Sequence, residues 1–117
     1  MEPHILSLAD QLLLIERELR RLDMWTAQAP SASALASTQP FCIDTLPLEQ
    51  WLQWVFLPRM KLILESADAL PRVSGILPMA ELAYQGRGPS VAGLLQAIES
   101  FDRLIAEVSE RHEQLGQ

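Results

Sequence analysis

The segment HILSLADQLLLIERELRRLDMW, residues 4–25, decides the fold class of this chain. Its apolar residues recur at alternating steps of three and four, the spacing that places side chains on one face of a helix: Ile5, Leu8, Leu12, Ile15, Leu19 and Leu22. Leu6, Leu13 and Leu14 widen this face, so we expect the helix to be buried against more than one neighbour. Glu16 and Arg20 are expected to pair on its polar side.

The same spacing returns in the last helical segment, which we expect from about Pro89 to His112. The repeating apolar residues are Val91, Leu94, Ile98, Phe101, Ile105 and Val108. Runs that alternate with a period of two, the pattern of strands, are missing from the sequence. The sequence therefore predicts an all-α fold, a compact bundle of about four helices. A length of 117 residues is typical of one domain, so we expect a single helical domain over residues 1–117.

A second helix is expected to begin after Asp44 or Thr45, either of which can cap its first free amides, and to run to about position 66. Pro58 lies inside this segment, where it removes a helical hydrogen bond, so a kink is expected near Phe56 or Leu57.

The remaining parts of the chain are a connector and a short helix. Ala, Ser, Thr, Gln and Pro dominate from Thr26 to Pro40, which predicts a long connector after the first helix. Pro78 is expected to open a short third helix that ends before Gly86.

Composition excludes several classes of function. Apolar residues make up 49% of the chain, and the net charge is −6, which would repel a phosphate backbone, so we expect no direct binding of nucleic acid. No apolar run approaches the ~20 residues that span a bilayer. The start, Met1-Glu2-Pro3-His4, lacks the basic residues of a secretory signal. We therefore expect a cytoplasmic protein without membrane contact.

The sequence contains no recognisable pattern of catalytic or metal-binding residues. His4 and His112 would approach each other if the terminal helices packed antiparallel, but no helical His pair or Cys-x-x-Cys element accompanies them, so no metal site is expected. Cys42 has no cationic neighbour in sequence, which predicts a buried, inert thiol. Gly86–Ser90 lacks the Lys and Ser or Thr ending of a phosphate-binding loop. We expect no cofactor, no catalytic residue and no enzymatic activity.

The aromatic residues concentrate in WLQWVFL, residues 51–57. These side chains point in nearly every direction around a helix, so a single contact cannot bury them all. Either several neighbours enclose the helix, or one face remains as an apolar docking patch with at least one tryptophan partly exposed. The candidate interaction surface comprises Phe41, Asp44, Thr45, Trp51, Trp54 and Arg59.

The runs STQPFCIDT (37–45), WLQWV (51–55) and PRM (58–60) resemble the YqcC-like family of small bacterial helical proteins, whose function is uncharacterised. The match is specific between Ser37 and Met60 and looser over the rest of the chain. The resemblance implies a compact helical bundle and a cytoplasmic bacterial protein. It also implies gene neighbourhood with a tRNA pseudouridine synthase, because members of the family are often encoded beside one. It supplies no catalytic residues.

Two functional hypotheses follow. The first is a non-enzymatic accessory or protein-interaction module that presents the surface around Phe41 to Arg59 to a protein partner or to a second copy of itself. The alternative is a small-molecule-binding protein, or an enzyme of unrecognised type, with a pocket between helices lined by Trp51, Trp54, Tyr84 and Arg59.

Overall fold

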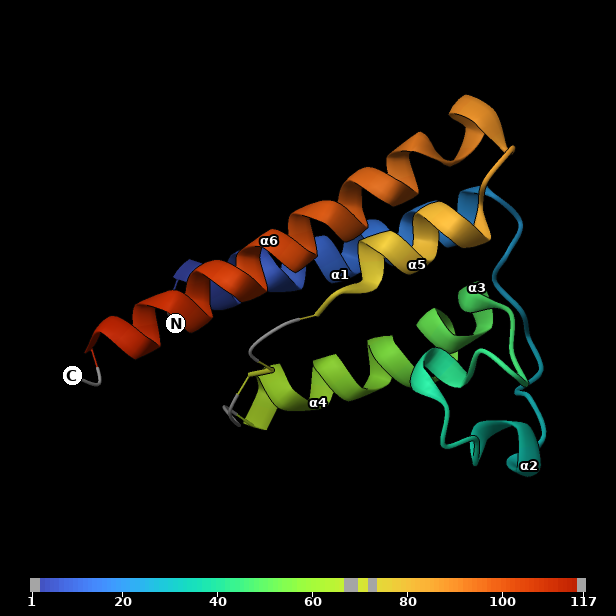
Figure 1. The fold of residues 1–117 in the computed structure, drawn as a ribbon, viewed down its shortest axis with the longest axis horizontal. Helices are drawn as coiled ribbons and strands as arrows, with labels where there is room; N and C mark the ends of the chain where they lie inside the picture. Colours follow the sequence, from blue (N-terminus) through green and yellow to red (C-terminus); the bar gives the residue numbers. More distant parts are fainter. Residues whose placement is uncertain (1–2, 67–69, 72–73, 116–117) are drawn as a thin grey trace.

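All regular elements are helical in the part of the chain that the computed structural model describes, residues 3–66, 70–71 and 74–115. The elements in chain order are α1 (Pro3–Arg21), α2 (Ala32–Leu35), the 3-10 turn η1 (Pro40–Cys42), α3 (Leu48–Trp51), the π turn η2 (Leu52–Phe56), α4 (Leu57–Ser66), α5 (Ile76–Ala83), the 3-10 turn η3 (Gly88–Val91) and α6 (Ala92–Leu115). Figure 1 shows α1, the α3–α4 segment, α5 and α6 running alternately in opposite directions. The predicted all-α bundle is confirmed.

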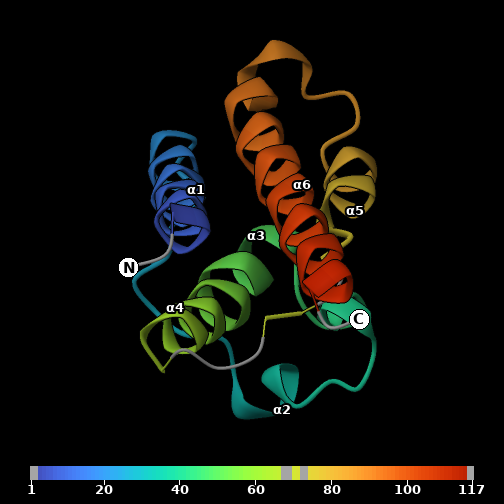
Figure 2. The same cartoon turned by 90° about the vertical axis from the view of Figure 1, so that its left-hand side faces the viewer.

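The core lies between the antiparallel pair α1 and α6 and the helices that cover it (Figure 2). All the repeating apolar residues predicted in the last helix are buried, and Leu8, Leu12, Ile15 and Leu19 are buried in α1. The expected burial of the widened α1 face is wrong for Leu6 and Leu13, which are 52% and 63% exposed. Both α6 and α4 contact α1, but they leave these two side chains in solvent.

The first helix ends at Arg21, four residues earlier than expected, because the chain turns there in a Schellman motif. Asp23 adopts a left-handed conformation with φ 63°. The Met24 amide donates to the Leu19 carbonyl at 2.9 Å, and the Asp23 amide donates to the Arg20 carbonyl at 3.1 Å, which satisfies the last carbonyls of the helix. The predicted pair on the polar side of α1 is present, with 3.1 Å between Arg20 Nε and Glu16 Oε2.

Helix α5 begins at Ile76, two residues before the expected start at Pro78, because a side chain of α6 caps it. The Asp102 carboxylate accepts hydrogen bonds from the amides of Ile76 at 3.3 Å and Leu77 at 2.8 Å. The Ser74 hydroxyl donates to the same carboxylate. These bonds satisfy amides at the start of the helix and tie α5 to α6.

A buried carboxylate of α1 lies close to the backbone of α6 at Gly93. Glu18 is 5% exposed, and Arg21 Nη2 donates to its Oε1 at 2.8 Å. This hydrogen bond holds the pKa of Glu18 below its usual value, against the opposing effect of burial. A Cβ placed on Gly93 of α6 would lie 2.3 Å from Glu18 Oε1. Glycine at position 93 therefore makes room for the ion pair.

Candidate functional site

The helical segment that carries the aromatic residues changes from α-helical to π-helical winding between α3 and α4 because of Pro58. The Leu57 amide bonds to the carbonyl of Leu52, five residues earlier, so Leu52–Phe56 form a π turn. Pro58 has no amide to offer the carbonyl four residues before it, and a widened turn accommodates this loss. The expected kink near Phe56 or Leu57 is thus a π turn, after which the helix continues. Trp51 and Trp54 are both half-buried, so the predicted partial exposure of a tryptophan is confirmed.

The loop before this helix holds Phe41 in an unusual conformation. Phe41 and Cys42 both have positive φ, 60° and 49°, which residues other than glycine seldom adopt. The Cys42 amide donates to the Gln39 carbonyl at 3.0 Å, and the Ile43 amide donates to the Pro40 carbonyl at 3.1 Å. Cys42 is buried, as expected. The result is a turn that places the half-buried Phe41 ring against α3.

A chain of aromatic rings connects this loop with the core. Phe41 meets Trp51 edge to face with 4.9 Å between ring centroids. Trp51 stacks on Phe56 at 5.5 Å, and Phe56 meets the fully buried Phe101 edge to face at 5.0 Å. Such ring pairs contribute ~0.5–1.5 kcal/mol each beyond the area they bury. Phe41 is therefore fixed to the core through three rings.

A first cavity of about 240 Å³ opens beside these rings, and its lining includes Arg59 of α4. The Arg59 side chain is exposed and forms no ion pair or hydrogen bond with any residue that the structure describes. The Trp51 indole N–H also forms no hydrogen bond with any described residue. The Ser74 hydroxyl, which belongs to the same lining, donates to Asp102. Among the side chains of this lining, Arg59 and Trp51 thus have donors without a partner.

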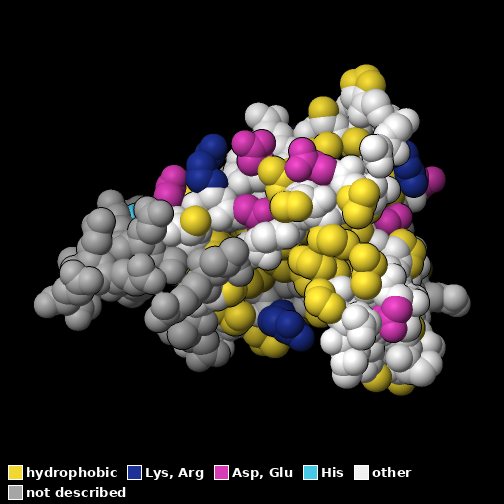
Figure 3. All heavy atoms as spheres, in the orientation of Figure 1, with side chains coloured by type: hydrophobic (Ala, Val, Ile, Leu, Met, Phe, Trp, Pro, Cys, Tyr) yellow, Lys and Arg dark blue, Asp and Glu magenta, His cyan; other side chains and the backbone are white. Residues whose placement is uncertain are grey.

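A second cavity, of about 260 Å³, shares Phe41 with the first in its lining. Its described lining is apolar and comprises Phe41, Ile43, Leu46, Pro47, Leu48, Met79, Leu82 and Ala83. Ile43 is 56% exposed and Leu82 is 64% exposed. We name the lining of the two cavities the Phe41 face, because Phe41 belongs to both. Figure 3 shows hydrophobic side chains gathered between α3, α4 and α5, with a basic side chain at the lower edge.

Most residues of the Phe41 face were absent from the predicted surface, among them Ile43, Met79 and Leu82. Ile43 could have been included, because it is an apolar residue two positions from Phe41 in a loop. Nothing in the sequence indicates Met79 and Leu82, since they join the face only through the contact between α5 and α3.

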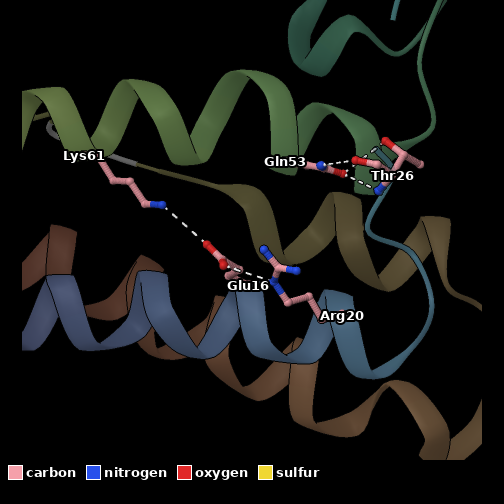
Figure 4. A network of polar contacts seen from close by, with 5 residues as sticks. All are labelled: Glu16, Arg20, Thr26, Gln53 and Lys61. Carbon is pink, nitrogen blue, oxygen red and sulfur yellow. Dashed lines mark hydrogen bonds and ion pairs between the residues drawn. The ribbon is translucent and has the colours of Figure 1, made fainter. Parts of the chain in front are cut away.

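Trp54, a predicted surface residue, lies elsewhere, against the residues that follow α1. Its indole Nε1 donates to the Thr26 hydroxyl at 3.0 Å. The neighbouring Gln53 is buried, and its side-chain amide forms two hydrogen bonds with the Thr26 backbone (Figure 4). Gln53 Oε1 accepts from the Thr26 amide at 2.9 Å, and Gln53 Nε2 donates to the Thr26 carbonyl at 2.7 Å. Figure 4 also shows Glu16 of α1 between Arg20 and Lys61 of α4. Trp54 therefore helps to fasten the connector and does not join Trp51 on the Phe41 face.

Asp44 and Thr45 do not cap the second helix, so that expectation is wrong. Pro47 occupies the N-cap position and forms no side-chain cap. Asp44 instead accepts a hydrogen bond from the Ser37 hydroxyl at 2.5 Å, and the Thr45 hydroxyl donates to the Ala34 carbonyl at 2.7 Å. The turn that contains them ends before the helix starts, and both side chains bind back to the connector.

The pocket considered as the alternative site is not assembled from its four residues. Trp51 and Arg59 line the first cavity, while Trp54 lines a different one with Lys61. Tyr84 is buried, and its hydroxyl lies 3.4 Å from Glu49 Oε1. Burial, with the nearby Glu49 charge, raises the pKa of Tyr84 far above its usual value, so the hydroxyl stays protonated and donates to Glu49.

Two further observations bear on the expected classes of site. Among the described residues, no group of three His, Cys, Asp or Glu side chains is placed to hold a metal ion. The side chain of His112 lies outside the described part. None of the helices described is both long enough and apolar enough to cross a membrane.

Known proteins resemble this chain along most of its length. A family model described as "DUF446: tRNA pseudouridine synthase C" matches residues 7–104. The uncharacterised protein YqcC of Escherichia coli K12 is 36% identical over 97 residues, which cover 83% of this chain and 89% of YqcC. The solution NMR structure of E. coli YqcC superposes with a TM-score of 0.78 at 33% identity and covers 90% of both chains.

Two other relatives match a shorter part of the chain. An uncharacterised protein of Haemophilus influenzae is 48% identical over 57% of this chain and 63% of its own length. A protein of Pectobacterium carotovorum named tRNA pseudouridine synthase C is 53% identical over 50% of this chain, a stretch that spans 15% of that protein. The matches to the family model and to YqcC both cover most of the chain, and the chain therefore belongs to the DUF446 family of YqcC-like proteins.

Proposed function

We propose that this protein is a non-enzymatic helical module that binds a protein partner through the Phe41 face. The observation that carries the proposal is the position of Phe41, a half-buried aromatic side chain that lines two mostly apolar cavities. Large apolar surfaces that stay open on a folded protein are characteristic of interaction sites. The exposed Ile43 and Leu82 extend this surface beyond the cavities.

The backbone at Phe41 gives the proposal independent support. Two successive residues with positive φ cost ~1–3 kcal/mol each, and such strain concentrates at functional sites. A loop that merely joined two elements could relax to negative φ. Here the strained turn holds an aromatic ring in place before a partner arrives, which reduces the entropy that binding must overcome.

The chemistry of the Phe41 face favours binding over catalysis. Arg59 is the one ionisable side chain in the described lining of its two cavities. A guanidinium stays protonated, so it does not act as a general base or nucleophile at neutral pH. The face therefore has the composition of an interface core with a charged rim.

We further propose a tRNA pseudouridine synthase as the partner. The family is described by that enzyme's name, and the longer Pectobacterium protein of that name contains a segment similar to half of this chain. Because the net charge is −6, we place the contact on the enzyme and not on tRNA.

The proposal can be tested by titrating the purified protein against a purified tRNA pseudouridine synthase C in biolayer interferometry. Leu82→Ser should weaken binding at least tenfold. Leu62→Ser is the matched control, because Leu62 is 63% exposed but lies outside the described lining of the Phe41 face. Equal losses in both variants would reject the Phe41 face, and no binding by the unaltered protein would reject this enzyme as partner. Sedimentation of the protein alone detects the competing outcome, association of two copies through the same face.

A further inference from the structure

We propose that the Phe41 face recognises a polypeptide segment with two bulky apolar side chains, one for each cavity, and a carboxylate opposite Arg59. This inference rests on the proposed function and specifies the chemistry of the partner. Two residues in the lining of the first cavity, Arg59 and Trp51, have a guanidinium and an indole N–H without a partner among the described residues. Both are donors, so a ligand that satisfies them brings acceptors.

The charge of Arg59 specifies the acceptor further. Arg20 and Lys61 pair with Glu16, Arg21 pairs with Glu18, and Arg87 lies over the Tyr84 ring, whereas Arg59 has no such partner among the described residues. A partner that covers the first cavity would desolvate Arg59, and an unpaired charge at an interface weakens binding. A carboxylate offsets this cost and matches the planar fork of donors on a guanidinium.

The size of the apolar surface favours a polypeptide over a small molecule. The cavities measure about 240 and 260 Å³, and each is smaller than the ~300–1,000 Å³ of ordinary ligand pockets. They are separate spaces that share Phe41 in their linings, and the second includes the exposed Ile43 and Leu82. Two anchoring side chains on one backbone fit this arrangement.

A phage-displayed library of random 16-residue peptides, selected on the full-length protein, tests the proposal. Enriched peptides should share two bulky apolar residues and an Asp or Glu. For a synthetic peptide from this group, Arg59→Glu should weaken binding at least tenfold in fluorescence polarisation. Replacing the peptide's acidic residue with Lys should restore binding to the Arg59→Glu protein. Leu82→Ser should also weaken binding, through the second cavity.

Arg103→Glu and Leu62→Ser are the matched controls, because both residues are exposed and neither belongs to the described lining of the Phe41 face. Peptides enriched without an acidic residue, or binding that is insensitive to Arg59→Glu, would overturn the carboxylate. A library that yields no peptide above background would overturn recognition of a linear segment. Binding of an intact folded partner, measured as above, could still succeed in that case, so the two proposals fail separately.

Discussion

The α1–α6 pair and the segment from Pro40 to Ser66 use apolar residues in different ways. Along η3 and α6, every apolar residue of the helical repeat is buried, whereas Gln96, Glu99, Arg103 and Glu107 are exposed. Between Pro40 and Ser66, a strained turn and a π turn interrupt regular structure, and Phe41, Trp51 and Trp54 remain half-buried. The helical repeat of the last helix thus coincides with burial, whereas partly open aromatic residues occur where the backbone is irregular.

Phe101→Ala should have the largest effect, because this α6 side chain is fully buried and also ends the ring chain from Phe41. The cavity should cost ~3–5 kcal/mol of unfolding free energy. Chemical denaturation measures this loss. A loss below ~1 kcal/mol would show that the α1–α6 core is less well packed than its burial indicates.

Gly93→Ala tests the packing of α6 against α1 beside Glu18. The added Cβ would overlap Glu18 Oε1, so we expect a loss of ~1–3 kcal/mol. In a Glu18→Ala background the same substitution should cost much less, because the colliding carboxylate is gone. Additive losses in this double-mutant cycle would contradict the proposed steric cause.

Gln53→Ala tests the irregular segment. Removing the amide leaves the Thr26 amide and carbonyl without these bonds, which should cost ~1–3 kcal/mol. Hydrogen exchange should accelerate at Thr26 and in the following connector. Gln96→Ala on the exposed surface of α6 is the control and should change neither quantity. Unchanged exchange at Thr26 would mean that other contacts hold the connector.

Asp23→Gly should have the smallest effect and the opposite sign. Glycine adopts the left-handed conformation at the end of α1 without the steric cost that Asp23 bears, so stability should rise by ~0.5–1 kcal/mol. A thermal melt would show this as a higher midpoint. A lower midpoint would indicate that the Asp23 side chain contributes more than its conformation costs.

The contrast between the two regions also explains how far the sequence could predict the structure. The helices α1 and α6 follow from local apolar spacing, which needs no knowledge of the rest of the fold. The start of α5 depends on Asp102, 26 residues from Ile76, and Asp44 bonds to Ser37 instead of to the helix that it precedes. A local rule for caps cannot distinguish such partners.

The residues of the candidate surface could likewise be predicted only in part. Phe41, Trp51 and Arg59 do line one cavity, because Trp51 and Arg59 lie on one continuous helical segment and the turn before it brings Phe41 to Trp51. Trp54 was separated from them by its hydrogen bond to Thr26, and Leu82 was added to the face by the packing of α5. Both effects depend on tertiary contacts, which the order of residues does not reveal.

The π turn also has a consequence for how this sequence tolerates insertions and deletions. A π turn contains one residue more than the α-helical turn it replaces, and one residue corresponds to a rotation of about 100° around the axis. Loss of a single codon between Leu52 and Phe56 would restore regular winding and leave Trp51 four positions before Phe56, a spacing that keeps two side chains on one face of an α-helix. The π turn can therefore lose its extra residue without separating the rings, whereas the same loss inside the regular helix α6 would rotate part of its apolar face by about 100° away from the core.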